Sequence, residues 1–405
     1  MLPAQNWKKQ FAILWCGQAT SLFTSSVLQM AIIWYLTEKT GSAAVLSFAT
    51  LVGFLPQAIL GTFIGALIDR YDRKTIMLLA DGSVALLGVL LALSGMWGEI
   101  PIWLIMVVLC LRSVGTAFHY PSLQALTPSI VPKKELTRYA GFAQSFESVS
   151  MILSPALAAV LFSLWPLEAI ILIDVAGAAF AAFMLCFIRL PKVSRVKPEK
   201  RQRLLQETIE GLRIMRQVSG LRELLIVGAV YALIYFPIGT LYPLITMTYF
   251  GGSVAQSGLV EVLFASGSLL GSLLLGLMAT KINKIFAISA SIGIYGAGLL
   301  ITGLLPPGGF RIFATLSLIM GLSVPFYTGI QTAIFQLKIR EEYLGRIFSL
   351  SSSVSMVAMP LGLVLSGTFA EMMGIEKWFL FSGVFTVALA VVTLLLPSLK
   401  DCCET

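Results

Sequence analysis

Residues 65–74 read Gly65-Ala66-Leu67-Ile68-Asp69-Arg70-Tyr71-Asp72-Arg73-Lys74, a densely charged turn between two long apolar runs. Each run is long enough to cross the roughly 30 Å of bilayer hydrocarbon as a helix. The chain must therefore leave and re-enter a membrane at this turn, where charged side chains lie outside hydrocarbon and cost little. Any basic cytoplasmic loop would explain the Arg and Lys residues, but it would not explain Gly65 and Asp69.

The whole chain is too apolar for a soluble protein. Of its 405 residues, 57% are apolar and 12% are charged, whereas about a quarter is charged in typical soluble domains. Twelve apolar runs are long enough to span a bilayer, and they cover approximately residues 11–36, 43–68, 75–96, 102–125, 139–164, 169–190, 222–247, 256–279, 285–305, 312–336, 347–370 and 378–397. We therefore predict an all-α polytopic membrane protein with twelve transmembrane helices.

The longest loop divides the predicted helices into two halves of six. Residues 191–221 are first basic and then amphipathic, which is typical of a segment that rests on inner headgroups. We assign residues 1–190 to an N-terminal half, 191–221 to a cytoplasmic linker and 222–405 to a C-terminal half with a short tail. An internal repeat supports this division, because Gly65–Ile76 aligns with Gly276–Ala287 at an offset of 211.

The distribution of basic residues predicts the orientation. Of the 28 Lys and Arg, only Lys39, Arg311 and Lys377 fall in loops opposite the N-terminus, so both termini are expected to be cytoplasmic. This asymmetry explains the net charge of +8 without a nucleic-acid partner. The single histidine and the dispersed cysteines offer no metal-ligand spacing. We therefore expect that the protein binds neither a metal nor a cofactor and that it is not an enzyme.

Ionisable residues inside the spans are the main functional candidates, because charge in hydrocarbon is costly. Arg112 lies in the fourth span, and Glu147 in the fifth is the favoured partner for it. His119 follows Arg112 by seven residues and so shares its helix face. Carboxylates in apolar surroundings can exchange protons near neutral pH, which a proton-coupled carrier requires. Arg112 could instead only brace the bundle, and His119 could be a hydrogen-bonded structural residue.

Three further carboxylates lie in apolar runs. Asp174 and Glu261 are expected near the outer surface and Asp81 near the inner one. They could carry protons, but a structural role at helix ends remains equally open for each of them.

The fifth span contains a row of small residues around a proline. The pattern is Ser150-x-x-x-Ser154-Pro155-x-x-Ala158-Ala159. Small side chains let two helices approach closely, and Pro155 removes one backbone hydrogen bond and bends the span. The pattern therefore predicts close helix packing at this point.

Several of these motifs resemble the major facilitator superfamily of secondary transporters. The charged turn resembles the loop between its second and third helices, although Asp72 stands where the family usually has Gly. Leu109–Gly115 resembles its fourth-helix Arg motif, and the small-residue pattern resembles its antiporter signature with each Gly replaced. The resemblance implies alternating access between two halves, a proton-coupling role for Arg112, and an inner gate formed by Gly65, Asp69, Arg70, Arg73 and Lys74.

In that superfamily, spans one, four, seven and ten line a central cavity. In this chain those spans carry aromatic residues with few polar ones, a lining that suits a large amphipathic substrate better than a small polar one. The candidate cavity residues are Gln29, Tyr231, Tyr235, Phe326, Tyr327 and Gln331.

A closer resemblance is to the macrolide efflux branch of the superfamily. It is carried by Gln29–Ser42, Arg112–His119, Met320–Ala333 and Glu342–Leu350. It implies an exporter of macrolide antibiotics in a bacterial inner membrane, driven by proton antiport and conferring drug resistance. We expect it to function as a monomer. A carrier of the same fold for another drug or a lysolipid, or a proton-coupled importer, remains the alternative.

Overall fold

The computed structural model describes residues 7–68, 72–132, 135–188, 220–278, 283–339 and 341–399. These ranges contain twelve long helices: α1 (Trp7–Thr40), α2 (Ala43–Ile68), α3 (Arg73–Met96), α4 (Ile102–Ile130), α5 (Leu136–Leu164), α6 (Leu167–Cys186), α8 (Leu221–Leu244), α9 (Val254–Met278), α10 (Lys284–Leu304), α11 (Phe310–Lys338), α12 (Glu341–Met373) and α13 (Ile375–Leu395). A π-helical turn, η2 (Ile245–Tyr249), continues α8, and a 3-10 turn, η3 (Pro307–Gly309), precedes α11.

The predicted all-helical membrane fold is confirmed. Each of the twelve apolar runs corresponds to one helix, and eleven helices in the described ranges are long and apolar enough to cross a membrane. The remaining helix, α5, contributes the shorter apolar stretch Val149–Leu164. Large apolar side chains such as Leu79 and Leu277 are 70% and 80% exposed, as expected where a surface faces lipid rather than water. The predicted linker, residues 191–221, lies almost entirely outside the described residues.

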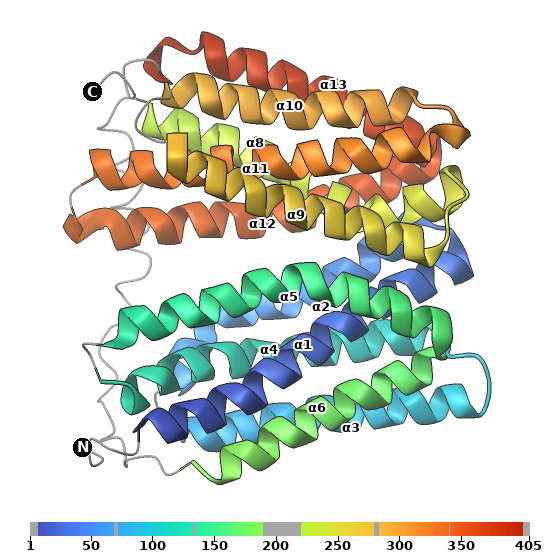
Figure 1. The fold of residues 1–405 in the computed structure, drawn as a ribbon, viewed down its shortest axis with the longest axis vertical. Helices are drawn as coiled ribbons and strands as arrows, with labels where there is room; N and C mark the ends of the chain where they lie inside the picture. Colours follow the sequence, from blue (N-terminus) through green and yellow to red (C-terminus); the bar gives the residue numbers. More distant parts are fainter. Residues whose placement is uncertain are drawn as a thin grey trace. The chain divides into compact units, whose positions relative to one another are not determined.

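The helices form two compact units. Unit 1 comprises Met1–Lys39 and Ala49–Pro198, and unit 2 comprises Thr40–Phe48 and Glu199–Thr405. Within unit 1, α3 packs along α6 and α4, and within unit 2 its counterpart α10 packs along α13 and α11. The helices of each unit can be followed in Figure 1. Both units therefore pair their third helix with their sixth and fourth, which gives the pseudo-symmetry that the repeat predicts.

The repeat extends to the way the third helix of each unit begins. Asp72 caps α3, since its Oδ2 accepts hydrogen bonds from the backbone N and the hydroxyl of Thr75 at 3.0 and 2.8 Å. Asn283 caps α10 in the same way, accepting from the backbone N of Phe286 at 3.1 Å. The two capping residues are 211 positions apart, the offset of the sequence repeat. A short polar acceptor satisfies backbone N–H groups that a helix N-terminus leaves free.

Glycines bring α9 and α11 into backbone contact within unit 2. A Cβ on Gly267 would meet the backbone of Leu318, and one on Gly321 would meet the backbone of Phe264. Gly271, one turn after Gly267, lies against Leu322 in the same way. Small residues at such a seam are typical of membrane helices, whose association depends on close packing rather than on burial from water.

Candidate functional site

A buried polar cluster joins α1, α4 and α6 inside unit 1. Nη1 of Arg112 donates to Oδ2 of Asp174 at 2.6 Å, and the Ser25 hydroxyl donates to the other carboxylate oxygen at 2.7 Å. The Asp174 side chain is 1% exposed and the Arg112 side chain 13%. Thr24 adds a longer contact of 3.5 Å to the same oxygen as Ser25. Both oxygens of Asp174 are therefore engaged, as a charge in an apolar interior requires.

The partner that the structure shows for Arg112 differs from the one favoured from the sequence. The sequence favours Glu147, whose side chain lies outside the described residues, so its pairing stays a prediction. The partner that the described residues show is Asp174. Arg112 lies ten residues after the start of α4 and Asp174 seven after the start of α6, so both are about 10–15 Å along their helices from the same end. Their positions along the helices therefore place Arg112 and Asp174 at a similar depth in the membrane. The rotation of α6 that turns Asp174 toward α4 depends on packing and cannot be obtained from these positions.

A second polar pair joins α3 and α4. Nε2 of His119 lies 3.2 Å from Oδ1 of Asp81, and their side chains are 10% and 8% exposed. The contact lacks the angle of a hydrogen bond, and the other oxygen of Asp81 has no hydrogen-bond partner within the described residues. His119 and Arg112 share a face of α4, but they contact different helices: His119 contacts Asp81 of α3, and Arg112 contacts Asp174 of α6. The pair becomes an ion pair only when the imidazole is protonated.

Only part of the charged turn is described. Gly65 lies in the last turn of α2, whereas Asp69 and Arg70 lie outside the described residues. Nζ of Lys74 donates to the backbone carbonyls of Cys186 and Ile188 at 3.0 and 2.9 Å. Lys74 therefore caps the C-terminal end of α6, where a cation is favoured by unpaired carbonyls and the helix dipole. Arg73 is partly exposed.

The small-residue row of α5 is buried. Ser154 and Ala158 are 2% and 0% exposed, and Ser150 and Ala159 are 9% and 7% exposed. Pro155 lies inside the helix and is buried as well. The hydroxyl groups of both serines lack a hydrogen-bond partner in the described part of the chain, so this face presents two free polar groups in an otherwise apolar row.

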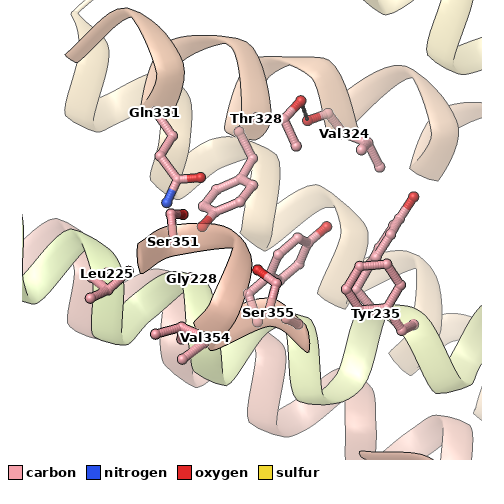
Figure 2. Close-up of a pocket in the computed structure, with 14 residues that line it drawn as sticks. Leu225, Gly228, Tyr235, Val324, Thr328, Gln331, Ser351, Val354 and Ser355 are labelled. Atoms are coloured by element: carbon pink, nitrogen blue, oxygen red, sulfur yellow. Dashed lines mark hydrogen bonds between the residues drawn. The ribbon is translucent and has the colours of Figure 1, made fainter. Parts of the chain in front are cut away.

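Unit 2 contains a pocket of about 130 Å³ between α8, α11 and α12. Tyr231, Tyr235, Tyr327 and Gln331, four of the six predicted cavity residues, line it. Figure 2 draws the lining side chains as sticks and labels Tyr235 and Gln331 among them. Of the other two candidates, Phe326 does not line the pocket, because it precedes Tyr327 on α11 and so points about 100° away around the helix. Gln29 belongs to α1 and is exposed.

The aromatic wall of the pocket is a tyrosine cluster. The ring of Tyr231 stacks on Tyr235 at 5.6 Å between centroids and contacts Tyr327 at 4.9 Å and Tyr295 at 5.7 Å. Tyr235 and Tyr295 are 5.5 Å apart. Tyr231 is 3% exposed, and its hydroxyl has no hydrogen-bond partner within the described ranges.

Glu261 on α9 is a carboxylate close enough to this cluster to influence it electrostatically. It interacts electrostatically with Tyr235, Tyr242 and Tyr295. It is partly exposed and takes part in none of the ion pairs found in the described residues. Unlike Asp174, Glu261 therefore pairs with no cation in the part of the chain that the structure describes.

Most of the polar side of the pocket is formed by residues that are not among the candidates predicted from the sequence. Thr328, Ser351 and Ser355 line it together with Gly228. The serines belong to the run Ser351-Ser352-Ser353-Val354-Ser355 inside an apolar span, which is a signal that could have been used. Gly228 carries no such signal, because its role depends on the side chains that face it. The described residues contain no group of ligands able to hold a metal ion.

Comparisons with known proteins agree with this architecture. The family model of the Major Facilitator Superfamily matches residues 14–244 and 224–401. The chain is 51% identical over 387 residues to macrolide efflux protein A of Streptococcus pyogenes, covering 96% of both chains. It is 24% identical to the multidrug efflux pump Tap of Mycobacterium tuberculosis, covering 92% of this chain and 90% of that one.

Solved transporter structures share the fold at low identity. A bacterial homologue of the iron transporter ferroportin, in an inward-facing state, superposes with a TM-score of 0.75 at 16% identity and covers both chains fully. The nucleoside transporter NupG gives 0.70 at 11% identity, covering 96% of this chain and 98% of that one. The chain is accordingly a multi-pass membrane transporter rather than an enzyme, and it belongs to the macrolide efflux branch of the Major Facilitator Superfamily.

Proposed function

We propose that the protein exports macrolide antibiotics across a bacterial inner membrane by proton antiport, and that its two six-helix halves alternate access to a shared substrate. The observation that carries the substrate class is the 51% identity to macrolide efflux protein A over 96% of both chains. Macrolides are bulky, largely apolar lactones that carry sugar substituents, one of them with a cationic amine. A mostly aromatic lining suits such amphipathic molecules.

The proton-coupling part of the proposal assigns proton exchange to the cluster in unit 1. Asp174 is held by Arg112 and Ser25 at 2.6 and 2.7 Å. Removing the negative charge by protonation would leave Arg112 as an unpaired charge in an apolar interior, which is strongly unfavourable. Protonation at Asp174 therefore requires Arg112 to find water or another acceptor. Because α1, α4 and α6 carry the groups of this cluster, a proton arriving there changes the contacts among three helices.

The charged turn supplies the inner gate in this proposal. Lys74 holds the end of α6 through two carbonyls, so a movement at the turn is transmitted to the helix that carries Asp174. Asp69 belongs to the gate by its family resemblance, and we expect Asp69→Asn to reduce transport while the protein still inserts into the membrane. Wild-type flux in that variant would remove Asp69 from the mechanism.

The experiment measures accumulation of radiolabelled erythromycin in cells that make the protein, with and without a protonophore. The proposal predicts lower accumulation than in empty cells and a return to the control level when the protonophore is added. The matched control is Asp174→Asn, brought to the same membrane level. Accumulation above that of empty cells would instead show import, and no difference would favour a carrier of another drug or a lysolipid.

A further inference from the structure

We infer that the pocket of unit 2 is a subsite for one neutral, hydroxylated six-membered ring of the substrate, such as a sugar substituent of a macrolide. The inference rests on the proposed macrolide substrate and names the part of it that unit 2 recognises. It is carried by the size of the pocket and by its uncharged polar lining.

The size of the pocket excludes a whole macrolide. Its volume is about 130 Å³, close to the roughly 150 Å³ of an engineered protein cavity that holds a single benzene ring. A large lactone cannot enter such a space, but one ring attached to it can. The pocket therefore has room for only one ring-sized substituent of the substrate.

The lining offers two kinds of surface to that ring. Tyr231, Tyr235 and Tyr327 provide aromatic faces, against which the C–H groups of a ring can pack. Hydroxyl and amide groups provide the polar side, and they come from Thr328 and Gln331 of α11 and from Ser351 and Ser355 of α12. Sugar rings have this combination of an apolar face and hydrogen-bonding edges.

The charge of the lining selects a neutral ring over an ammonium group. None of the residues that line the pocket is charged, and Glu261 on α9 is not among them. Tyrosine faces attract cations, but a desolvated ammonium group would lack a carboxylate partner here. The neutral sugar is thus the better match, and the amino sugar becomes an outcome that the test must distinguish.

Tyr231 contributes its ring to the pocket. Its hydroxyl has no partner among the described residues, but the oxygen is fully buried and does not open into the pocket. The Tyr327 hydroxyl is bonded to Gln331, so these two side chains form one end of the polar side.

Gly228 keeps this end of the pocket open. A Cβ at Gly228 would meet the Tyr327 hydroxyl and Nε2 of Gln331. A methyl group there would push the bonded pair into the pocket and narrow the site. Gly239 lies on the same helix and has nothing within 4 Å of an added Cβ, so it offers a control in which the same substitution meets no neighbour.

The test compares binding of erythromycin with binding of its derivative from which the neutral sugar has been removed, using the purified full chain in lipid nanodiscs. For the wild type and Gly239→Ala, we expect removal of the sugar to weaken binding about tenfold. Gly228→Ala narrows the pocket, and it should weaken erythromycin binding about threefold to tenfold while it leaves binding of the sugar-free derivative unchanged. Tyr231→Phe removes only a buried hydroxyl that does not open into the pocket, so it should leave binding of both compounds unchanged.

The outcomes separate this inference from the proposed function. An equal loss for both compounds in Gly228→Ala would overturn the neutral-sugar subsite while leaving macrolide binding intact. The pocket would instead be assigned to the amino sugar if Gly228→Ala weakened binding of both compounds but left binding of an erythromycin derivative with a modified amine unchanged. Binding of neither compound by the wild type would overturn the macrolide substrate, and the subsite with it.

Discussion

Inside unit 1 the buried carboxylate of Asp174 is held by Arg112 and Ser25, whereas in unit 2 the carboxylate of Glu261 has no ion-pair partner among the described residues. The interior of unit 1 is thus organised by charge, and the pocket of unit 2 by neutral aromatic and hydroxyl groups. Two halves that share helix order, packing and capping have diverged in their interiors. The proposed function assigns proton exchange to the charged cluster of unit 1 and the substrate to the neutral pocket of unit 2.

The largest effect is expected from breaking the ion pair of unit 1. Asp174→Asn leaves Arg112 buried without a counter-charge, which costs about 3–5 kcal/mol of folding stability. Arg112→Gln should cost a similar amount because it leaves Asp174 unpaired. Thermal unfolding in detergent measures both effects, and the double variant should be more stable than the sum of the single losses predicts.

Two outcomes would contradict the predicted role of the Arg112–Asp174 pair. Strict additivity in the double variant would show that the two side chains do not stabilise one another. Asp174→Glu serves as the conservative control, because it keeps the charge while changing its position. If all these variants kept a normal dependence of transport on pH, the cluster would be structural only.

A smaller loss is expected from the glycine seam of unit 2. Gly267→Ala places a methyl group against the backbone of Leu318, and overpacking of this kind costs about 1–3 kcal/mol. Gly276→Ala on the same helix meets nothing within 4 Å and should be neutral or slightly stabilising. Unfolding temperatures of the two variants test this, and equal values would show that α9 and α11 tolerate separation.

Comparable small losses are expected at the two equivalent helix caps. Asp72→Ala and Asn283→Ala each remove a side-chain acceptor at the start of α3 or α10, which costs about 1 kcal/mol. Because the caps occupy the same place in the repeat, their effects on stability should match. Asp72→Asn, which keeps an acceptor, is the control. A loss at one cap only would show that the two turns are not equivalent.

The smallest stability effect is expected for Glu261→Gln. No described cation is paired with Glu261, so neutralising it leaves no orphaned charge. We expect a change in unfolding free energy below about 1 kcal/mol, far less than for Asp174→Asn. A loss as large as that of Asp174→Asn would contradict the contrast between the two units.

Much of the fold could be predicted from the sequence, because long apolar runs and the basic residues between them report directly on membrane spans. At the repeat offset of 211, Asp72 aligns with Asn283, and these two residues are the caps of α3 and α10. Asp72, which departs from the usual family pattern, now has a physical role as a cap.

The site was harder to predict, because its contacts depend on how each helix is rotated. The sequence placed Arg112 among the key residues but favoured Glu147 over Asp174 as its partner. It identified Tyr231, Tyr235, Tyr327 and Gln331 but missed Gly228, whose importance depends on the side chains opposite it. The sequence shows which charged residues would be energetically unfavourable inside a membrane. Only the packing of the helices shows which of these residues contact one another.

The central claim is that Asp174 couples proton movement to macrolide export, and reconstituted protein tests it most directly. Purified wild type and Asp174→Asn would be placed in liposomes with an internal pH indicator, and erythromycin would be added without any imposed gradient. The account predicts macrolide-driven proton movement in the wild type and none in Asp174→Asn, even where nanodisc binding of erythromycin is retained. Proton movement at the wild-type rate in the variant would contradict the account.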